Sequence, residues 1–240
     1  MSLLIKTTGP VVRIDLARPD EGNAMTLDMM RELAKTVREY GANPDTRVIA
    51  IAPRGEQFCR GRDVGGAPSG GAKPSAYHLR TVVMAAVLGV YDAFAACPVP
   101  TVACVQGDAL GFGAAMAAAA DITLVSDHAL LGFTEIEHNI PPALAMAAVL
   151  GKVPSKLLTW LTYSAEKVRA EQAVSFGLAS KVLPRERFEQ ESKAFLETLA
   201  GRPRLVLETI KRYQTNASAL SPEMASEYAG TLLALVSTAE

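Results

Sequence analysis

The sequence has few cysteines and no excess of charge of either sign. Its three cysteines, Cys59, Cys97 and Cys104, are odd in number and form no CxxC pair. This argues against a disulfide framework and against a structural zinc site. Lys and Arg together number 24, and Asp and Glu together number 25, so no overall field would attract nucleic acid or an anionic membrane surface. We therefore expect no metal site and no nucleic-acid partner, and a polyanionic ligand would need a local cluster of cations.

Long apolar runs are also scarce. The opening stretch MSLLIKTTGPVVRIDL alternates in polarity, and Pro10 and Arg13 interrupt it, so it does not match the apolar region of a signal peptide. The alanine-rich run that ends at Ala120 is bracketed by Gly and Asp and falls short of the roughly 20 apolar residues that span a bilayer. We expect a cytoplasmic protein without a membrane partner.

The remaining pattern predicts a mixed α/β protein. With 240 residues, 49% of them hydrophobic, the chain can bury a sizeable core. Short strands alternate with helices up to about residue 183, after which helical periodicity alone continues. This predicts a core over residues 1–184 and a C-terminal helical region over 185–240. The expected strands are 3–8, 11–16, 47–53, 101–105 and 122–126, and a tight turn joins the first two. The expected helices in the core begin at 27 with Thr26 as N-cap, run over 77–96 and begin again at about 111, with a loop over 55–71. Three helices are expected after residue 184.

The stretch VQGDALGFGAAMAAAAD, residues 105–121, is rich in glycine and alanine. A strand that leads into such a helix start presents unpaired backbone N–H groups at the positive end of the helix dipole, where glycine lets a ligand come close. The alternative is that the small residues only allow tight packing, and it stays open at this point. The spacing of Gly107, Gly111 and Gly113 matches neither G-x-G-x-x-G nor a P-loop.

A second glycine-containing loop, RGEQFCRGRDVGG at residues 54–66, also follows a buried strand. It carries Arg54, Arg60 and Arg62, and three arginines this close could meet phosphates. Each arginine taken alone is typical of a solvated surface turn. Two such loops after two strands are more informative together than either is alone.

With these loops, the chain resembles the crotonase family, the enoyl-CoA hydratase/isomerase superfamily. The resemblance rests on five segments in order: RPDEGNAMT (18–26), GEQFCRGRDV (55–64), PVPTVACVQGDALGFGAAMAAAADITLVSD (98–127), LGFTEIEHNIPP (131–142) and AEQAVSFGLASKVLP (170–184). It implies an α/β fold, a spiral of repeated β-β-α units followed by a helical trimerisation region. A homotrimer or a dimer of trimers is the assembly it implies.

The resemblance also implies an acyl-CoA thioester substrate, with no separate cofactor because coenzyme A is part of that substrate. The thioester carbonyl would lie between the backbone N–H groups of Arg62 and Phe112, which would stabilise an enolate as an oxyanion hole. Asp121 resembles a structural carboxylate of the family. The residues that would contact CoA are Ala24, Arg60, Arg62, Asp63 and Val64.

The base that the resemblance implies is Glu135, in GFTEIEH. Hydratases of the family use two glutamates, and the position of the first is occupied here by Ala115, which has no acid-base chemistry. One carboxylate suffices for an allylic proton shift, since it can remove a proton from C2 of a 3-enoyl thioester and return one at C4. Burial against the acyl chain would raise its pKa toward neutrality. Double-bond isomerisation is therefore favoured over hydration.

Two further carboxylates are candidate helpers. Asp108 precedes the glycine turn, and Glu137 would share the face of Glu135 if that segment were extended, with His138 then pointing away. His78 and His128 are interpreted as surface and structural residues. Two other interpretations remain open. Ala115, and Phe112 where the family usually has glycine, leave room for an acyl-CoA-binding protein without catalysis, and the apolar C-terminal helices leave room for a fold kept for assembly. Hydration with a non-standard second group is the remaining enzymatic alternative.

Overall fold

Two β-sheets form the centre of the protein. The computed structural model describes residues 2–65 and 74–239. Its strands are β1 (Leu3–Thr8), β2 (Val11–Leu16), β3 (Val48–Pro53), β4 (Thr101–Val105), β5 (Ala109–Leu110), β6 (Ile122–Ser126), β7 (Leu130–Gly132), β8 (Val168–Arg169) and β9 (Lys181–Leu183). Within the described residues the larger sheet has the order β1-β2-β3-β4-β6-β9 and the smaller one β5-β7-β8. The larger sheet is parallel apart from the β1–β2 hairpin.

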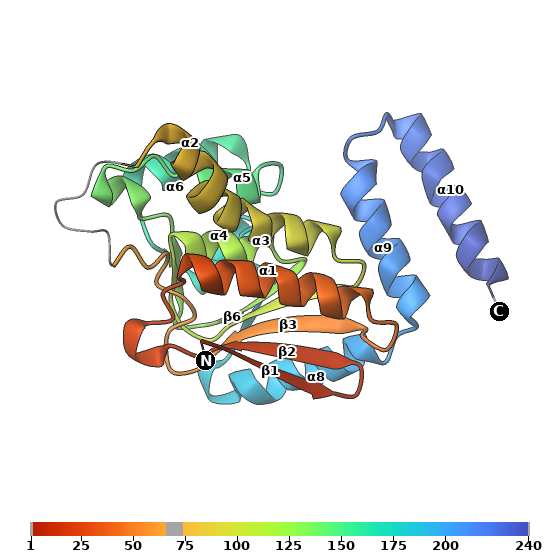
Figure 1. The fold of residues 1–240 in the computed structure, drawn as a ribbon. Coiled ribbons are helices and arrows are strands. Elements are labelled where there is room, and N and C mark those ends of the chain that lie inside the picture. Colours follow the sequence, from red (N-terminus) through yellow and green to blue (C-terminus); the bar gives the residue numbers. More distant parts are fainter. Residues whose placement is uncertain (1, 66–73, 240) are drawn as a thin grey trace.

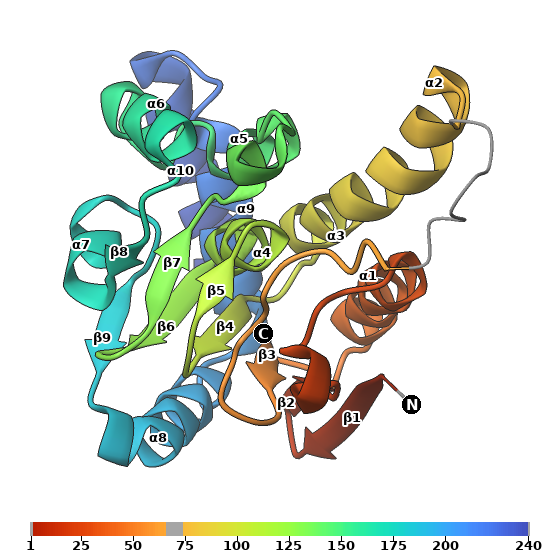
Figure 2. The same ribbon diagram turned by 90° about the vertical axis from the view of Figure 1, so that its left-hand side faces the viewer.

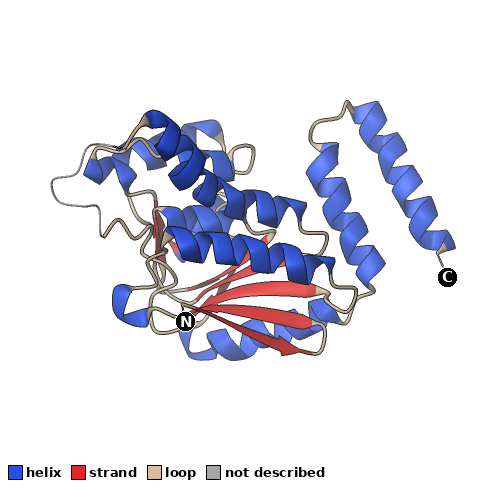
Figure 3. Ribbon diagram, viewed as in Figure 1, coloured by secondary structure: helices blue, strands red, loops and turns tan. Residues whose placement is uncertain are grey.

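Helices surround these sheets (Figures 1 and 3). Short 3-10 segments lie at η1 (Pro19–Glu21), η3 (Glu135–His138) and η4 (Arg185–Arg187), and η2 (Leu79–Met84) is π-helical. The α-helices are α1 (Leu27–Ala42), α2 (Ala76–His78), α3 (Ala85–Ala96), α4 (Phe112–Ala119), α5 (Ala143–Val149), α6 (Ser155–Ser164), α7 (Ala170–Ser175), α8 (Phe188–Ala200), α9 (Arg204–Ala217) and α10 (Pro222–Thr238).

The larger sheet is covered on both faces, which explains why its central strands are continuously apolar. All of β3 is buried. Ile49 and Ile51 pack into the main core with α1 and α3, whereas Val48 and Ala50 pack into a second cluster with Phe188 of α8. Figure 1 shows α1 and α8 on opposite sides of the sheet. A period-two strand between two helical layers therefore contributes to two cores at once.

Most of the elements expected from the sequence are present. The hairpin at residues 3–16, the strands at 101–105 and 122–126 and the three C-terminal helices are confirmed. The predicted N-cap of α1 is confirmed as well: Thr26 Oγ1 accepts a hydrogen bond from Met29 N at 3.2 Å. The predicted loop is irregular over its described part, and its remaining residues lie outside the described part of the chain.

One continuous helical rod, Ala76–Ala96, includes the helix expected at 77–96. By length and composition this 21-residue rod is apolar enough to cross a membrane, a property that core helices of soluble proteins share. Here it packs on α1 at its C-terminal part and projects beyond the sheet at the other end (Figure 2). Its π-helical turns at η2 are of a kind often found at functional sites.

The last two helices, α9 and α10, form a hairpin at one side of the molecule (Figure 1). Lys211 on α9 is buried, and its Nζ donates to Phe94 O, to Val99 O and to Asp121 Oδ2 at 2.7, 3.2 and 2.7 Å. Asp121 Oδ2 also accepts from Thr101 N at 2.7 Å. Asp121 thus connects α9 to the start of β4, a structural role. Helix α8 belongs to the predicted C-terminal region but packs on the sheet of the core. The predicted division at residue 184 therefore stays a prediction.

Candidate active site

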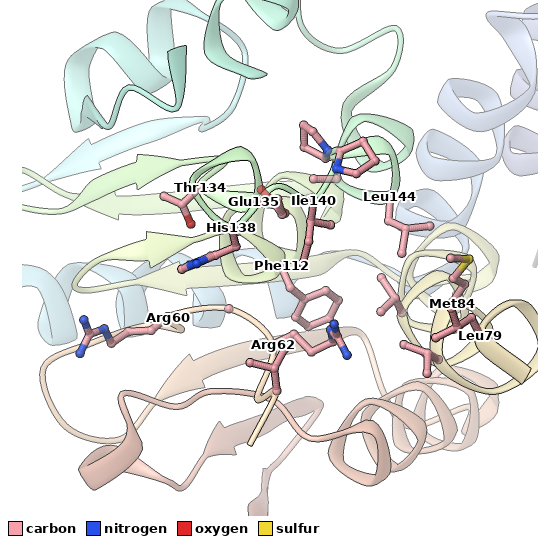
Figure 4. Close-up of a pocket in the computed structure, with 18 of the residues that line it drawn as sticks. Arg60, Arg62, Leu79, Met84, Phe112, Thr134, Glu135, His138, Ile140 and Leu144 are labelled. Atoms are coloured by element: carbon pink, nitrogen blue, oxygen red, sulfur yellow. The ribbon is translucent and has the colours of Figure 1, made fainter. Parts of the chain in front are cut away.

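A pocket of about 280 Å³ opens between the loop at 60–64, the helical rod, the start of α4 and the segment 134–145 (Figure 4). Apolar side chains of the rod and of α5 form one wall, and the polar groups come from the loop and from η3. The lining residues include Arg60, Arg62, Val64, Leu79, Val83, Met84, Val87, Tyr91, Phe112, Glu135, His138, Ile140 and Leu144. The rod and segment 134–145 thus shape the part that could receive an apolar chain.

The glycines around this pocket have two different roles. A Cβ on Gly107 would overlap Glu56 O, and a Cβ on Gly113 would overlap Cys59 O, so these two glycines let the two loops pack backbone against backbone. The packing interpretation of the small residues is correct at these positions. Gly111 differs, since its φ of 52° is a conformation that side chains disfavour and its Cα faces the pocket.

The backbone N–H groups of Arg62 and Phe112 both lack a hydrogen-bond acceptor among the described residues. Met25 bonds to the neighbours of Arg62, from Met25 N to Gly61 O and from Asp63 N to Met25 O, both at 2.9 Å, so Arg62 N points away from that bridge. Phe112 is the first residue of α4, where N–H groups have no partner within the helix. A Cβ on Gly61 would lie 3.9 Å from Phe112 N. The two donors therefore lie on adjoining backbone, and their role as an oxyanion hole stays a prediction.

Glu135 is the first residue of η3, and its carboxylate lies beside Gly111. A Cβ built on Gly111 would be 3.5 Å from Glu135 Oε1. Burial raises the pKa of Glu135, and an interaction with its own backbone N–H lowers it to a smaller extent. Among the described residues that line the pocket, it is the only carboxylate. A raised pKa and a position beside Gly111, the residue before the free Phe112 N–H, suit a general base.

The conditional prediction about Glu137 and His138 was wrong in its geometry. It assumed extended backbone, but residues 135–138 form a 3-10 helix, in which side chains three positions apart share a face. His138 therefore lines the pocket with Glu135, and Glu137 is exposed and lies outside the pocket wall.

The other candidate helper, Asp108, is also outside the described pocket wall. Its Oδ1 accepts from Leu130 N at 3.0 Å, and its backbone oxygen accepts from Phe58 N at 3.1 Å. These bonds join the glycine turn to β7 and to the second loop. Ala115 is fully buried and does not line the pocket, so no acid-base group takes its place at that position.

The residues expected to contact CoA separate into two groups. Arg60, Arg62 and Val64 line the pocket. Ala24 and Asp63 lie outside its wall and are joined by Arg18, a residue that sequence reasoning missed. The Nη1 of Arg18 donates to Ala24 O at 2.8 Å and to Asp63 Oδ2 at 2.9 Å. The bond from Arg18 to Asp63, together with a bond from Gly65 N, lowers the pKa of Asp63. Arg54 is exposed and outside the wall.

Tyr91 is a second pocket residue that sequence reasoning missed. Its ring stacks on Phe112, with centroids 5.9 Å apart, and its hydroxyl is buried without a hydrogen-bond partner among the described residues. A signal was present in the sequence: Val83, Val87 and Tyr91 recur every four residues, which places them on one face of the predicted helix. The pattern does not reveal which face meets the pocket.

Comparison with known proteins places this geometry in a family. The sequence model of the family described as enoyl-CoA hydratase/isomerase matches residues 6–234. The chain belongs to this enoyl-CoA hydratase/isomerase family. A Rhodococcus jostii protein, named (7aS)-7a-methyl-1,5-dioxo-2,3,5,6,7,7a-hexahydro-1H-indene-carboxyl-CoA hydrolase, is 30% identical over 181 residues, which cover 75% of this chain and 67% of that one.

Two other relatives extend this picture. The mouse mitochondrial Delta(3,5)-Delta(2,4)-dienoyl-CoA isomerase is 27% identical over 181 residues, which cover 72% of this chain and about half, 55%, of that protein. An enoyl-CoA hydratase-like protein of Thermobifida fusca, solved in complex with CoA, is 25% identical and superposes with a TM-score of 0.87 over 99% of this chain and 95% of that chain. The crotonase-type spiral with its C-terminal helices, expected from the sequence, is confirmed for this enoyl-CoA hydratase/isomerase family member.

Proposed function

We propose that this chain binds an acyl-CoA thioester and moves a double bond in its acyl group, with Glu135 as the single base. The observation that carries this proposal is the solitary carboxylate: Glu135 lines the pocket, whereas Ala115 is buried and carries no acid. The CoA complex of the Thermobifida fusca relative supports the choice of ligand. Arg60 and Arg62 at the pocket supply positive charge for its phosphates.

The chemistry needs one proton acceptor and one place for negative charge. Glu135 removes a proton from C2 of a 3-enoyl thioester, and the electron pair delocalises onto the thioester oxygen. The N–H groups of Arg62 and Phe112 hold that oxygen, and donors of this kind lower a barrier by about 3–4 kcal/mol each. The same carboxyl then returns the proton at C4, so the 2-enoyl product forms without a net gain or loss of atoms.

The experiment is hydrogen exchange in heavy water with butanoyl-CoA, a 2-enoyl-CoA and a 3-enoyl-CoA, followed by mass spectrometry. The wild type should incorporate deuterium at the α-carbon and move the double bond. Glu135→Gln should abolish both while leaving CoA binding intact. Glu137→Gln is the matched control, because Glu137 is exposed on the same short helix, and it should behave like the wild type.

Other outcomes would change the proposal. A gain of one water in the product would favour hydration with a non-standard second group. Binding of butanoyl-CoA without exchange on any ester would contradict catalysis and favour a non-catalytic acyl-CoA-binding protein. Exchange that survives in Glu135→Gln would remove Glu135 from the base role.

A homotrimer or a dimer of trimers completes the proposal. The helices α9 and α10 expose the large apolar side chains of Ile210, Met224, Leu233 and Leu235, and an apolar groove of about 480 Å³ lies between these helices. Exposed apolar patches of this kind favour association. Light scattering after size-exclusion chromatography should give three or six times the monomer mass, and a monomer would contradict this part of the proposal.

A further inference from the structure

Two buried side-chain atoms in the described part of the chain lack a hydrogen-bond partner: the Tyr91 hydroxyl and Glu135 Oε2. Both residues line the same pocket. Buried polar groups in proteins are nearly always paired, so an unpaired one calls for an explanation. One of these atoms is a donor and the other is an acceptor, so a single hydrogen bond between them would satisfy both.

The two residues approach the same short piece of backbone. The Tyr91 ring lies against the Phe112 ring at an interplanar angle of 25°. The Glu135 carboxylate lies against Gly111, the residue before Phe112, through Oε1. Tyr91 on α3 and Glu135 on η3 therefore flank the start of α4, and the atom of Glu135 that remains without a partner is Oε2.

The electrostatics agree with a donor role for the tyrosine. Burial, and then the nearby charge of Glu135, raise the pKa of Tyr91. The phenol therefore keeps its proton across the physiological pH range and can donate a hydrogen bond, but it cannot serve as a base.

We propose that Tyr91 is a positioning residue for the Glu135 base: with an acyl-CoA in the pocket, its hydroxyl donates to Glu135 Oε2 and leaves Oε1, beside Gly111, to face the thioester α-carbon. This inference rests on the proposed function, because it takes Glu135 as the base. The last side-chain torsion of Glu135 is soft, so we expect Oε2 to turn toward the hydroxyl when the ligand binds. Catalytic hydrogen bonds often tighten only when the ligand is bound.

The other titratable groups around Glu135 come from two neighbouring segments. Arg60 and Arg62 of the loop and His138 of η3 line the same pocket as Glu135, while the residues of α5 that line the pocket carry no charge. Cys59 lies near Tyr91, and burial raises the pKa of its thiol to about 12. Tyr91→Phe leaves these groups in place, so a change in the titration of Glu135 reports on the hydroxyl alone.

The test compares the wild type, Tyr91→Phe and Tyr40→Phe in the exchange assay with butanoyl-CoA as a function of pH. Tyr40 lies on α1, half-buried and outside the described pocket wall, and is the matched control. A donor to a carboxylate stabilises its ionised form. Loss of the Tyr91 hydroxyl should therefore shift the acid limb of the pH–rate profile to higher pH by about one unit. It should also lower kcat about tenfold and leave KM within about twofold of the wild-type value. Tyr40→Phe should match the wild type.

A second readout does not require turnover. The pKa of Glu135 can be followed by carbon NMR in glutamate-labelled protein with butanoyl-CoA bound, with Glu135→Gln to identify the resonance. If the wild type shows no exchange, the proposed function fails, but a higher Glu135 pKa in Tyr91→Phe still supports the pairing. An unchanged Glu135 pKa in this variant overturns it. A raised KM with unchanged kcat and pH limb also overturns it, because Tyr91 would then only shape the pocket.

Discussion

The carboxylate of Glu135 lies directly against the bare backbone of Gly111, with Oε1 3.5 Å from where a Cβ on that glycine would be. The relationship matters because Gly111 immediately precedes Phe112, whose N–H is one of the two free donors at the pocket. The proposed base and one proposed oxyanion donor are thus held on the two sides of one residue. A side chain at position 111 would be strained at its φ of 52°, although a Cβ there would only make ordinary van der Waals contact with the carboxylate.

The first prediction concerns the pH dependence of activity. Burial raises the pKa of Glu135, and the proposed mechanism needs its ionised form. The rate of α-proton exchange should therefore rise with pH through a limb that lies above the usual range of a glutamate. The measurement is kcat/KM for a 3-enoyl-CoA between about pH 4 and pH 8. A limb at the ordinary glutamate value would show that Glu135 is not buried in the working enzyme.

The second prediction concerns the pH dependence of folding stability. It follows from the same raised pKa of Glu135, but here a higher pH is unfavourable. Because the folded-state pKa of Glu135 is raised, its favourable contribution to folding is fully present below the unfolded-state pKa and is lost as pH rises through the folded-state value. Glu135→Gln removes the buried charge. Its melting temperature should exceed that of the wild type at about pH 8 and match it at about pH 4. Glu137→Gln, at an exposed site, should show no such difference.

The third prediction separates the backbone of residue 112 from its side chain. Phe112 is the first residue of α4, where proline is well tolerated because the missing N–H has no partner within the helix. Phe112→Ala keeps the N–H and Phe112→Pro removes it. We expect the proline variant to lose about 10²–10³ in kcat relative to the alanine variant, at similar stability.

Circular dichroism melts of both variants provide the control for that comparison. Equal rates in two folded variants would exclude the Phe112 N–H from the oxyanion hole. A loss in both variants would instead point to the ring, which stacks on Tyr91.

Local signals in the sequence predicted the scaffold well. The N-cap Thr26, the buried strand 48–53 and the helix start at Phe112 follow from periodicity and capping, which act over a few residues. These are interactions that the residues make with their immediate neighbours in the chain. The positions of Arg62 and Phe112 came from the family resemblance, and their role as an oxyanion hole stays a prediction.

What could not be predicted depends on packing between distant segments. The stacking of Tyr91 on Phe112 and the bond of Arg18 to Asp63 join elements that no local pattern relates. The side of η3 that faces the pocket also depended on its 3-10 geometry, which short polar segments do not reveal. His138 was therefore placed away from the pocket, although it lines it.

The fourth prediction concerns charge at the pocket. Arg60 and Arg62 line it, and Arg54, from the same loop, does not. Arg60→Ala and Arg62→Ala should weaken CoA binding about three- to tenfold at low salt, and less at high salt because ions screen exposed charges. Arg54→Ala is the control and should bind CoA like the wild type. Calorimetric titration with CoA measures the affinity. Equal losses of affinity at all three positions would indicate that the arginines act only through the overall positive charge of the loop.

The last prediction concerns the bond that ties the C-terminal hairpin to the core. Lys211 is buried, and its three bonds go to Phe94 O, Val99 O and Asp121. Lys211→Met keeps the length of the side chain but removes its three hydrogen bonds and leaves Asp121, whose side chain is partly exposed, without this cation. The free energy of unfolding should therefore fall by about 1–3 kcal/mol. Lys193→Met, at an exposed pair 3.9 Å long, should change it by less than about 1 kcal/mol. Urea unfolding measures both. Lys211 does not line the pocket, so the folded Lys211→Met protein should retain the α-proton exchange of the wild type. A loss of exchange without a loss of stability would mean that α9 shapes the active site.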